Sequence, residues 1–292
     1  MIIGHQNQQR KLQALLKKNQ IPHAFLFSGP EKIGKRKVVS WFLKMINCSN
    51  GKDDGPCNCC RSCLEIKEKT HTDMVWVSPE KKEIYLEQIE EVINKVSYKG
   101  SKAVFKGVLI DDAHLMNPYA QNALLKVLEE PPKDTLFFLV TSYPSILLPT
   151  VISRLFELKF STVPEGDIEK SLRNSEVSSL SFERPGIAIE YLRFPEKKER
   201  AEKLKSDIEE IFEKDMAFRF SKVKEIVKEE RAKDFLEYLL KVMQEGMKGE
   251  LREKASTKKT REALTEIQET LFLRSKTNIN VQLALEKIML KI

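Results

Sequence analysis

Short apolar runs that alternate with helix-like segments are the feature that most restricts the fold of this chain. Five segments are predicted as strands: 24–28, 74–77, 104–110, 135–141 and 155–160. Between them, residues 38–46 and 84–96 carry apolar side chains at helical spacing. Asn117 and Pro118 predict the start of another helix, which Pro131 and Pro132 end. Apolar strands joined by helices predict a mostly parallel sheet covered on both faces, an α/β domain.

The chain changes character after this first part. Predicted strands stop after Phe160, and residues 162–200 predict a small helical lid. From there to residue 292 the pattern is helical, with an apolar stripe near the end that is typical of a core or of an oligomer interface. We therefore expect three parts: 1–161, 162–200 and 201–292, the last an all-α domain that mediates oligomerisation.

Charge and hydropathy narrow the class of protein. The net charge is +7, yet residues 1–47 alone hold nine Lys and Arg against one acid. This basic N-terminal face is either a surface for nucleic acid or another anion, or simply a solvated surface. No apolar run reaches 18 residues and the first residues show no secretory pattern. The expectation is a cytoplasmic protein with no membrane segment.

A glycine-rich loop follows the first predicted strand. Gly29 and Gly34 belong to the pattern G-x-x-x-x-G-K, in which backbone N–H groups and Lys35 surround phosphates. The next residue of a working loop is Ser or Thr, whose hydroxyl binds Mg²⁺, but here it is Arg36. The alternative is an ordinary glycine turn.

A second motif agrees with the first. Residues 108–110 form an apolar strand that ends in Asp111, the Walker B pattern, in which this aspartate holds Mg²⁺. Asp112 stands where hydrolytic members usually have Glu, and it is shorter by one methylene. Two departures in two motifs predict a nucleotide-binding fold that has lost, or nearly lost, hydrolysis. Whether ATP and Mg²⁺ still bind is left open.

Four cysteines form a candidate metal site. Cys48, Cys57, Cys60 and Cys63 are spaced so that four thiolates can meet one ion, which suits a structural zinc within residues 48–63. An iron–sulfur cluster and free thiols are the alternatives. The role of Cys59, next to Cys60, is open.

Ser153 and Arg154 precede the last predicted strand. One interpretation is a local salt bridge. The other is an arginine that projects from the edge of the domain and stabilises charge on a γ-phosphate held by a neighbouring subunit.

Taken together, these motifs resemble the delta-prime subunits of the bacterial DNA polymerase III clamp loader, a family of AAA+ proteins. The similarity is carried by Gly4-His5, 22–30, the cysteine spacing, 111–113, 122–132, Ser153-Arg154 and 280–291. It implies a RecA-like domain with a zinc module, a lid and a helical collar that joins subunits in a ring. It also implies that Arg154, with Ser153, is a finger for the adjacent ATPase subunit, although Leu155 replaces the family's Cys. Gly186 occupies a position where ATPase subunits carry a sensor arginine.

The resulting hypothesis is a non-hydrolysing, stator-like subunit that is not an enzyme on its own but helps to load the sliding clamp onto primed DNA. The partners implied are the gamma/tau ATPase subunits, the delta subunit, the clamp and, through the assembly, DNA. The alternative is an ATP-hydrolysing subunit of the same loader or a related AAA+ ATPase. A sequence-specific DNA-binding zinc protein is disfavoured, because the cysteine segment has no recognition helix.

Overall fold

A computed structural model describes residues 1–292 except 52–54, 81, 98–102, 230, 247–257 and 277–279. The chain divides into two compact units, a sheet unit of Met1–Ile187 and a helical unit of Ala188–Ile292. Each is described by itself. None of the described helices is both long and apolar enough to cross a lipid bilayer.

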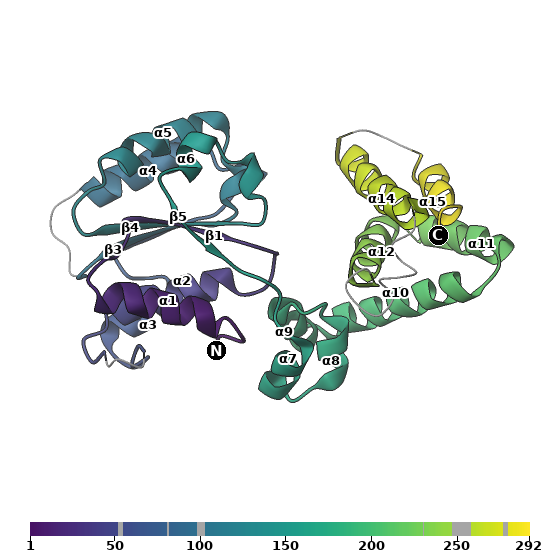
Figure 1. Cartoon of the computed structure of the whole chain (residues 1–292), viewed down its shortest axis with the longest axis horizontal. Helices are drawn as coiled ribbons and strands as arrows, with labels where there is room; N and C mark the ends of the chain where they lie inside the picture. The colour runs from purple at the N-terminus through teal and green to yellow at the C-terminus, as the bar shows by residue number, and fades with distance from the viewer. Residues whose placement is uncertain (52–54, 81, 98–102, 230, 247–257, 277–279) are drawn as a thin grey trace. The chain divides into compact units, whose positions relative to one another are not determined.

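Five parallel strands form the centre of the sheet unit (Figure 1). They are β1 Ala24–Ser28, β2 Met74–Val77, β3 Lys106–Ile110, β4 Thr135–Thr141 and β5 Phe156–Lys159. Their order across the sheet is β2-β3-β4-β1-β5, so β1 and β4 are central. The predicted parallel sheet is confirmed. Two strands are shorter than their apolar runs: β3 begins after the exposed Val104, and β5 ends before Phe160.

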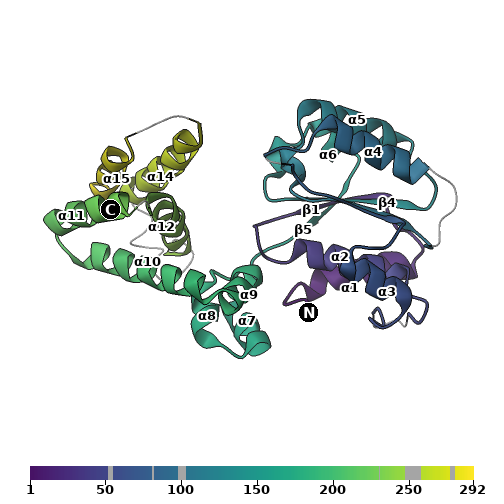
Figure 2. The ribbon, with the colours of Figure 1, turned by 180° about the vertical axis from the view of Figure 1, so that it is seen from behind.

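Helices cover both faces of this sheet (Figures 1 and 2). One face carries α1 Gln6–Lys17, α2 Lys35–Ile46 and α3 Arg61–Glu68; the other carries α4 Leu86–Ser97, α5 Pro118–Glu129 and α6 Pro149–Ile152. Side chains alternate along β1, so that Phe25 and Phe27 enter one core and Ala24 and Leu26 the other. Two apolar cores explain why strands of this sheet lack a polar side.

Helix α5 begins and ends where the sequence predicts. The Asn117 side chain accepts a hydrogen bond from the N–H of Ala120, at 2.8 Å, and the helix ends at Glu129, two residues before Pro131. Because α5 follows β3 and precedes β4, it connects two neighbouring parallel strands of the sheet.

The sheet unit ends in short helices. They are α7 Glu165–Leu172, α8 Ser175–Leu180 and the first residues of α9 Pro185–Arg193. The boundary between the two compact units falls inside α9. The three-part division at residues 161 and 200 stays a prediction.

The described residues of the helical unit form helices only: α10 Pro195–Glu213, α11 Met216–Lys228, α12 Ala232–Gly246, α14 Lys258–Lys276 and α15 Val281–Met289. The apolar stripe of the last helix faces the interior, where Leu285, Ile288 and Met289 are fully buried.

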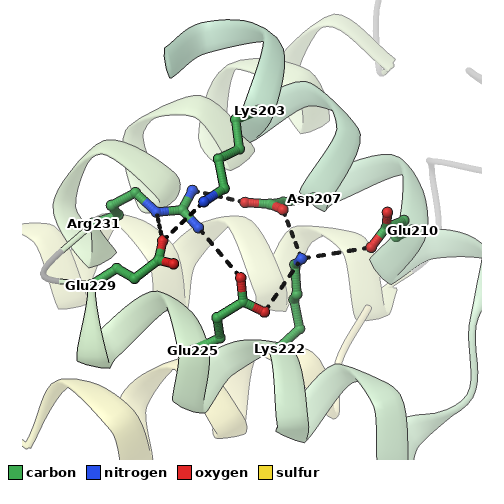
Figure 3. Close-up of polar contacts among 7 residues, drawn as sticks. All are labelled: Lys203, Asp207, Glu210, Lys222, Glu225, Glu229 and Arg231. Atoms are coloured by element: carbon green, nitrogen blue, oxygen red, sulfur yellow. Dashed lines mark hydrogen bonds and ion pairs between the residues drawn. The ribbon is translucent and has the colours of Figure 1, made fainter. Parts of the chain in front are cut away.

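An ionic network joins three segments of the helical unit (Figure 3). At its centre the buried carboxylate of Asp207, on α10, binds Lys222 of α11 at 2.9 Å and Arg231 at 2.8 Å. Its other members are Lys203, Glu210, Glu225 and Glu229. Both oxygens of Asp207 thus have a cationic partner, so the network fixes how α10 and α11 meet the start of α12.

Candidate functional site

The glycine-rich loop has the backbone of a phosphate-binding loop. Gly29 follows β1 directly, and Gly34 precedes α2 with a φ of 108°. At Gly29 the φ is 143°, and a Cβ would lie 2.2 Å from the carbonyl oxygen of Phe160, so no larger residue fits there. This tight turn places the N-terminus of α2 beside the loop, with no acidic residue in the first helical turn.

Lys35 points back into the loop. Its Nζ donates to the carbonyl oxygens of Gly29, at 2.5 Å, and Pro30, at 2.6 Å, and to Oγ of Ser142 at 3.2 Å. Burial lowers the pKa of Lys35 to about 8, with nearby acids such as Asp112 opposing that shift. The ammonium group therefore lies inside the glycine-rich loop, and its role in phosphate binding stays a prediction.

The residues at the two magnesium positions bind each other. Arg36 Nη1 lies 2.7 Å from Oδ2 of Asp111, in an ion pair between the start of α2 and the end of β3. The aspartate side chain is only 9% exposed, whereas that of Arg36 is 65% exposed. Burial raises the pKa of Asp111, and Arg36 offsets part of that effect. The guanidinium group of Arg36 thus binds the carboxylate that the Walker B pattern assigns to a metal.

Asp112 stands at the head of the short turn that follows β3. It has a left-handed backbone, with φ 47°, and precedes His114, whose Nδ1 lies 3.2 Å from Oγ1 of Thr141. Burial lowers the pKa of His114, with Asp112 opposing the shift. The structure therefore places Asp112 near the loop.

Two contacts that the sequence did not reveal hold the loop from either side. The N–H of Gly186, at the start of α9, donates to the carbonyl oxygen of Lys32 at 2.7 Å. A Cβ at residue 186 would lie 2.4 Å from that same oxygen. On the other side, Nε2 of His5 lies 2.8 Å from the carbonyl oxygen of Ile33, and burial lowers the pKa of His5. Gly186 therefore has a steric reason to be glycine.

The four predicted cysteines come together. Their Sγ atoms all lie within 4.8 Å of one another, and those of Cys48 and Cys60 are 3.9 Å apart. Tetrahedral zinc with sulfur ligands needs about 3.8 Å between sulfurs, so the group fits zinc. Burial of Cys60 is outweighed by hydrogen bonds from the backbone of Cys63 and Ser49, which lower the pKa of its thiol to about 5. Cys59 is exposed and lies outside the group.

Arg154 lies between α6 and β5 and is bound to its own chain. Its Nη2 is 2.7 Å from Oε1 of Glu129, and its Nη1 donates to the carbonyl oxygen of Thr150 at 2.8 Å. The Nη1 atom also lies 3.3 Å from Oγ of Ser153. The local ion pair is thus present, while the role of Arg154 as a finger for another subunit stays a prediction. Glu129 is a residue that the sequence analysis missed as its partner.

Comparison with known proteins decides the family. Residues 4–164, more than half of the chain, match the family described as "DNA polymerase III, delta subunit". The chain belongs to this family. Among curated relatives of this clamp-loader group, the delta' subunit of Bacillus subtilis DNA polymerase III is 36% identical over 163 residues, which cover 56% of this chain and 49% of the relative.

The tau/gamma subunits are also similar to this clamp-loader chain. That of Haemophilus influenzae is 32% identical over 187 residues, which cover 64% of this chain but 27% of the relative. The matched part of the chain therefore spans about a quarter to a half of these relatives. A solved gamma subunit-related protein from Thermotoga maritima aligns with 96% of this chain and 97% of its own, at a TM-score of 0.50 and 18% identity. This last similarity concerns the fold alone.

Proposed function

We propose that this chain is a non-hydrolysing subunit of the clamp loader and supplies Arg154 to the ATP site of a neighbouring subunit. The observation that carries the proposal is the ion pair between Arg36 and Asp111. Hydrolysis in this class requires Mg²⁺ held by a hydroxyl and by the Walker B aspartate. Here the hydroxyl is missing, and the aspartate is bound to a side chain of its own protein.

The rest of the proposed role follows from the family. The chain assembles with gamma/tau ATPase subunits and a delta subunit, and the assembly places the sliding clamp on primed DNA. Exposed lysine and arginine side chains on and after α1, namely Arg10, Lys11 and Lys18, give the assembly a surface for DNA phosphates. The cysteine group holds a structural zinc, which predicts one zinc per chain in metal analysis.

The decisive experiment is reconstitution of the chain with clamp-loader ATPase subunits. Arg154→Ala removes the cation that stabilises charge on the γ-phosphate, so hydrolysis at the adjacent site falls by on the order of 10³-fold. Arg154→Lys keeps the charge but loses the bidentate geometry, so its hydrolysis rate lies between those of wild type and Arg154→Ala. An unchanged ATPase rate in an Arg154→Ala complex of normal composition would overturn the finger role.

The second candidate, an ATP-hydrolysing subunit, is favoured by the similarity to tau/gamma subunits. It is tested on the purified chain alone with Mg-ATP. Turnover that is lost in Lys35→Ala would establish this alternative, because Lys35 is the phosphate-binding lysine of the loop. Absence of turnover in a chain that still assembles supports the non-hydrolysing role.

A further inference from the structure

Both terminal nitrogens of Arg154 have partners within its own chain. One terminal nitrogen, Nη2, binds the carboxylate of Glu129, and the other binds the Thr150 carbonyl and the Ser153 hydroxyl. Ser153 in turn donates to the Thr150 carbonyl at 3.0 Å. A guanidinium group binds phosphate through these same two nitrogens. These contacts use three of the five N–H groups of the guanidinium, so a phosphate bound end-on through both terminal nitrogens has to take the place of Glu129.

Glu129 is a well-fixed partner. It is the last residue of α5, whose inward side chains Leu124 and Leu128 belong to the core between helix and sheet. Nε2 of His23 lies 3.1 Å from the carbonyl oxygen of Leu128, which ties the end of the helix to the segment before β1. The carboxylate thus projects from a rigid part of the sheet unit, 25 residues before the arginine in sequence.

We propose that Glu129 holds Arg154 in a resting position and competes for it with the triphosphate of the neighbouring subunit. This inference rests on the proposed finger role. The side chains of Arg154 and Glu129 are 35% and 52% solvent-exposed, so the ion pair is weak. A triphosphate carries several negative charges against the single charge of Glu129, and it displaces the carboxylate when it is present. When the phosphate leaves, Arg154 returns to Glu129.

The test measures how tightly the full chain binds the ATPase subunits, with a non-hydrolysable ATP analogue and without nucleotide. Glu129→Gln removes the competing charge, so binding in the presence of the analogue becomes about two- to fivefold tighter, the range expected for an exposed ion pair. Binding without nucleotide does not change. Glu130→Gln is the matched control, since Glu130 is the adjacent exposed carboxylate and is not among the partners of Arg154.

The Glu129→Gln change in a chain that also carries Arg154→Ala separates the resting-position hypothesis from the finger hypothesis. In Arg154→Ala the gain from Glu129→Gln disappears, because the carboxylate acts only through the arginine. If Arg154→Ala leaves the nucleotide-dependent part of binding intact, the finger role itself fails. If Arg154→Ala removes the nucleotide-dependent part of binding, the finger role stands. In that case the resting position is overturned if Glu129→Gln binds like wild type, binds more weakly, or tightens binding equally in the Arg154→Ala chain.

Discussion

Two buried aspartates, each bound to an arginine, show how differently the two units use charge. Asp207 in the helical unit meets Lys222 and Arg231, which are themselves mostly buried. Burial alone would raise its pKa, but hydrogen bonds from both cations outweigh burial and lower it. Asp111 in the sheet unit is paired with the exposed Arg36, and burial keeps its pKa raised.

The difference separates a carboxylate whose charged form the fold stabilises from one whose charged form it does not. Asp207 is stabilised in its charged form by the fold, so its network contributes to stability and to the arrangement of α10 and α11. The charged form of Asp111 is still disfavoured despite its partner, because burial outweighs the effect of Arg36 on its pKa. Four changes test this comparison.

The largest expected effect is that of Asp207→Asn. Loss of the central charge removes the buried partner of Lys222 and Arg231 and leaves them the more exposed glutamates of the network, which lowers the free energy of unfolding of the helical unit by about 3 kcal/mol. Hydrogen exchange of amides in α10 and α12 measures it. Glu209→Gln is the control, since Glu209 makes only an exposed pair with Lys205 at 3.9 Å. A loss below about 1 kcal/mol would mean that the network is no more than a surface feature.

The second-largest effect is expected in the pH dependence of the stability of the helical unit. Because the folded pKa of Asp207 lies below its ordinary value of 3.8, the folded state binds the proton less tightly than the unfolded state. The stabilisation is fully present above pH 3.8 and is lost as the pH falls through the folded pKa. Hydrogen exchange between pH 5 and pH 2.5 should therefore show a steeper loss in wild type than in Asp207→Asn. Equal slopes would contradict the assignment.

Arg36→Thr should convert Asp111 into a metal ligand. The change supplies a hydroxyl and frees the carboxylate, so the affinity for Mg-ATP should rise relative to that for ATP in EDTA by about tenfold, or 1.4 kcal/mol. Isothermal titration calorimetry on the full chain measures it. Arg36→Val, which frees the carboxylate but adds no hydroxyl, is the control. Equal affinities with and without Mg²⁺ in Arg36→Thr would show that Asp111 is not placed for a metal.

The smallest effect is expected for Asp111→Asn. Since its folded pKa is raised, the charged group costs stability above its ordinary pKa, and its removal leaves an arginine that is already 65% exposed. Stability should change by less than about 1 kcal/mol, whereas Arg36→Gln, which strands the carboxylate, should lower it by about 1–2 kcal/mol. Both tryptophans, Trp41 and Trp76, lie in the sheet unit, so their fluorescence reports its unfolding. A larger loss of stability in Asp111→Asn than in Arg36→Gln would contradict the comparison of the two aspartates.

Much of the fold follows from local sequence. Continuous apolar strands, the Asn117 cap and the cysteine spacing each act over a few residues, and each prediction from them was confirmed in position or in proximity. The pairing of Arg36 with Asp111 was not predicted, although both residues were named. It depends on the strand order, which places β4 alone between β3 and β1.

The partners of other side chains cannot be read from the sequence. In a chain with 32% charged residues, Asp207 and Glu129 look like any acid on a helix surface until their partners are brought to them by tertiary packing. His5 is likewise a lone histidine near the start of the chain, and its bond to the Ile33 carbonyl depends on where the first residues cross the loop.

The close approach of residue 186 to the glycine-rich loop restricts which side chains the chain can carry at this position. Any Cβ there would collide with the Lys32 carbonyl, so an arginine at this position requires the loop or the helix to move first. A hydroxyl at residue 36 would leave this steric limit unchanged. A larger side chain at residue 186 therefore needs a matching shift of the backbone around Lys32, a segment that is far away in the sequence.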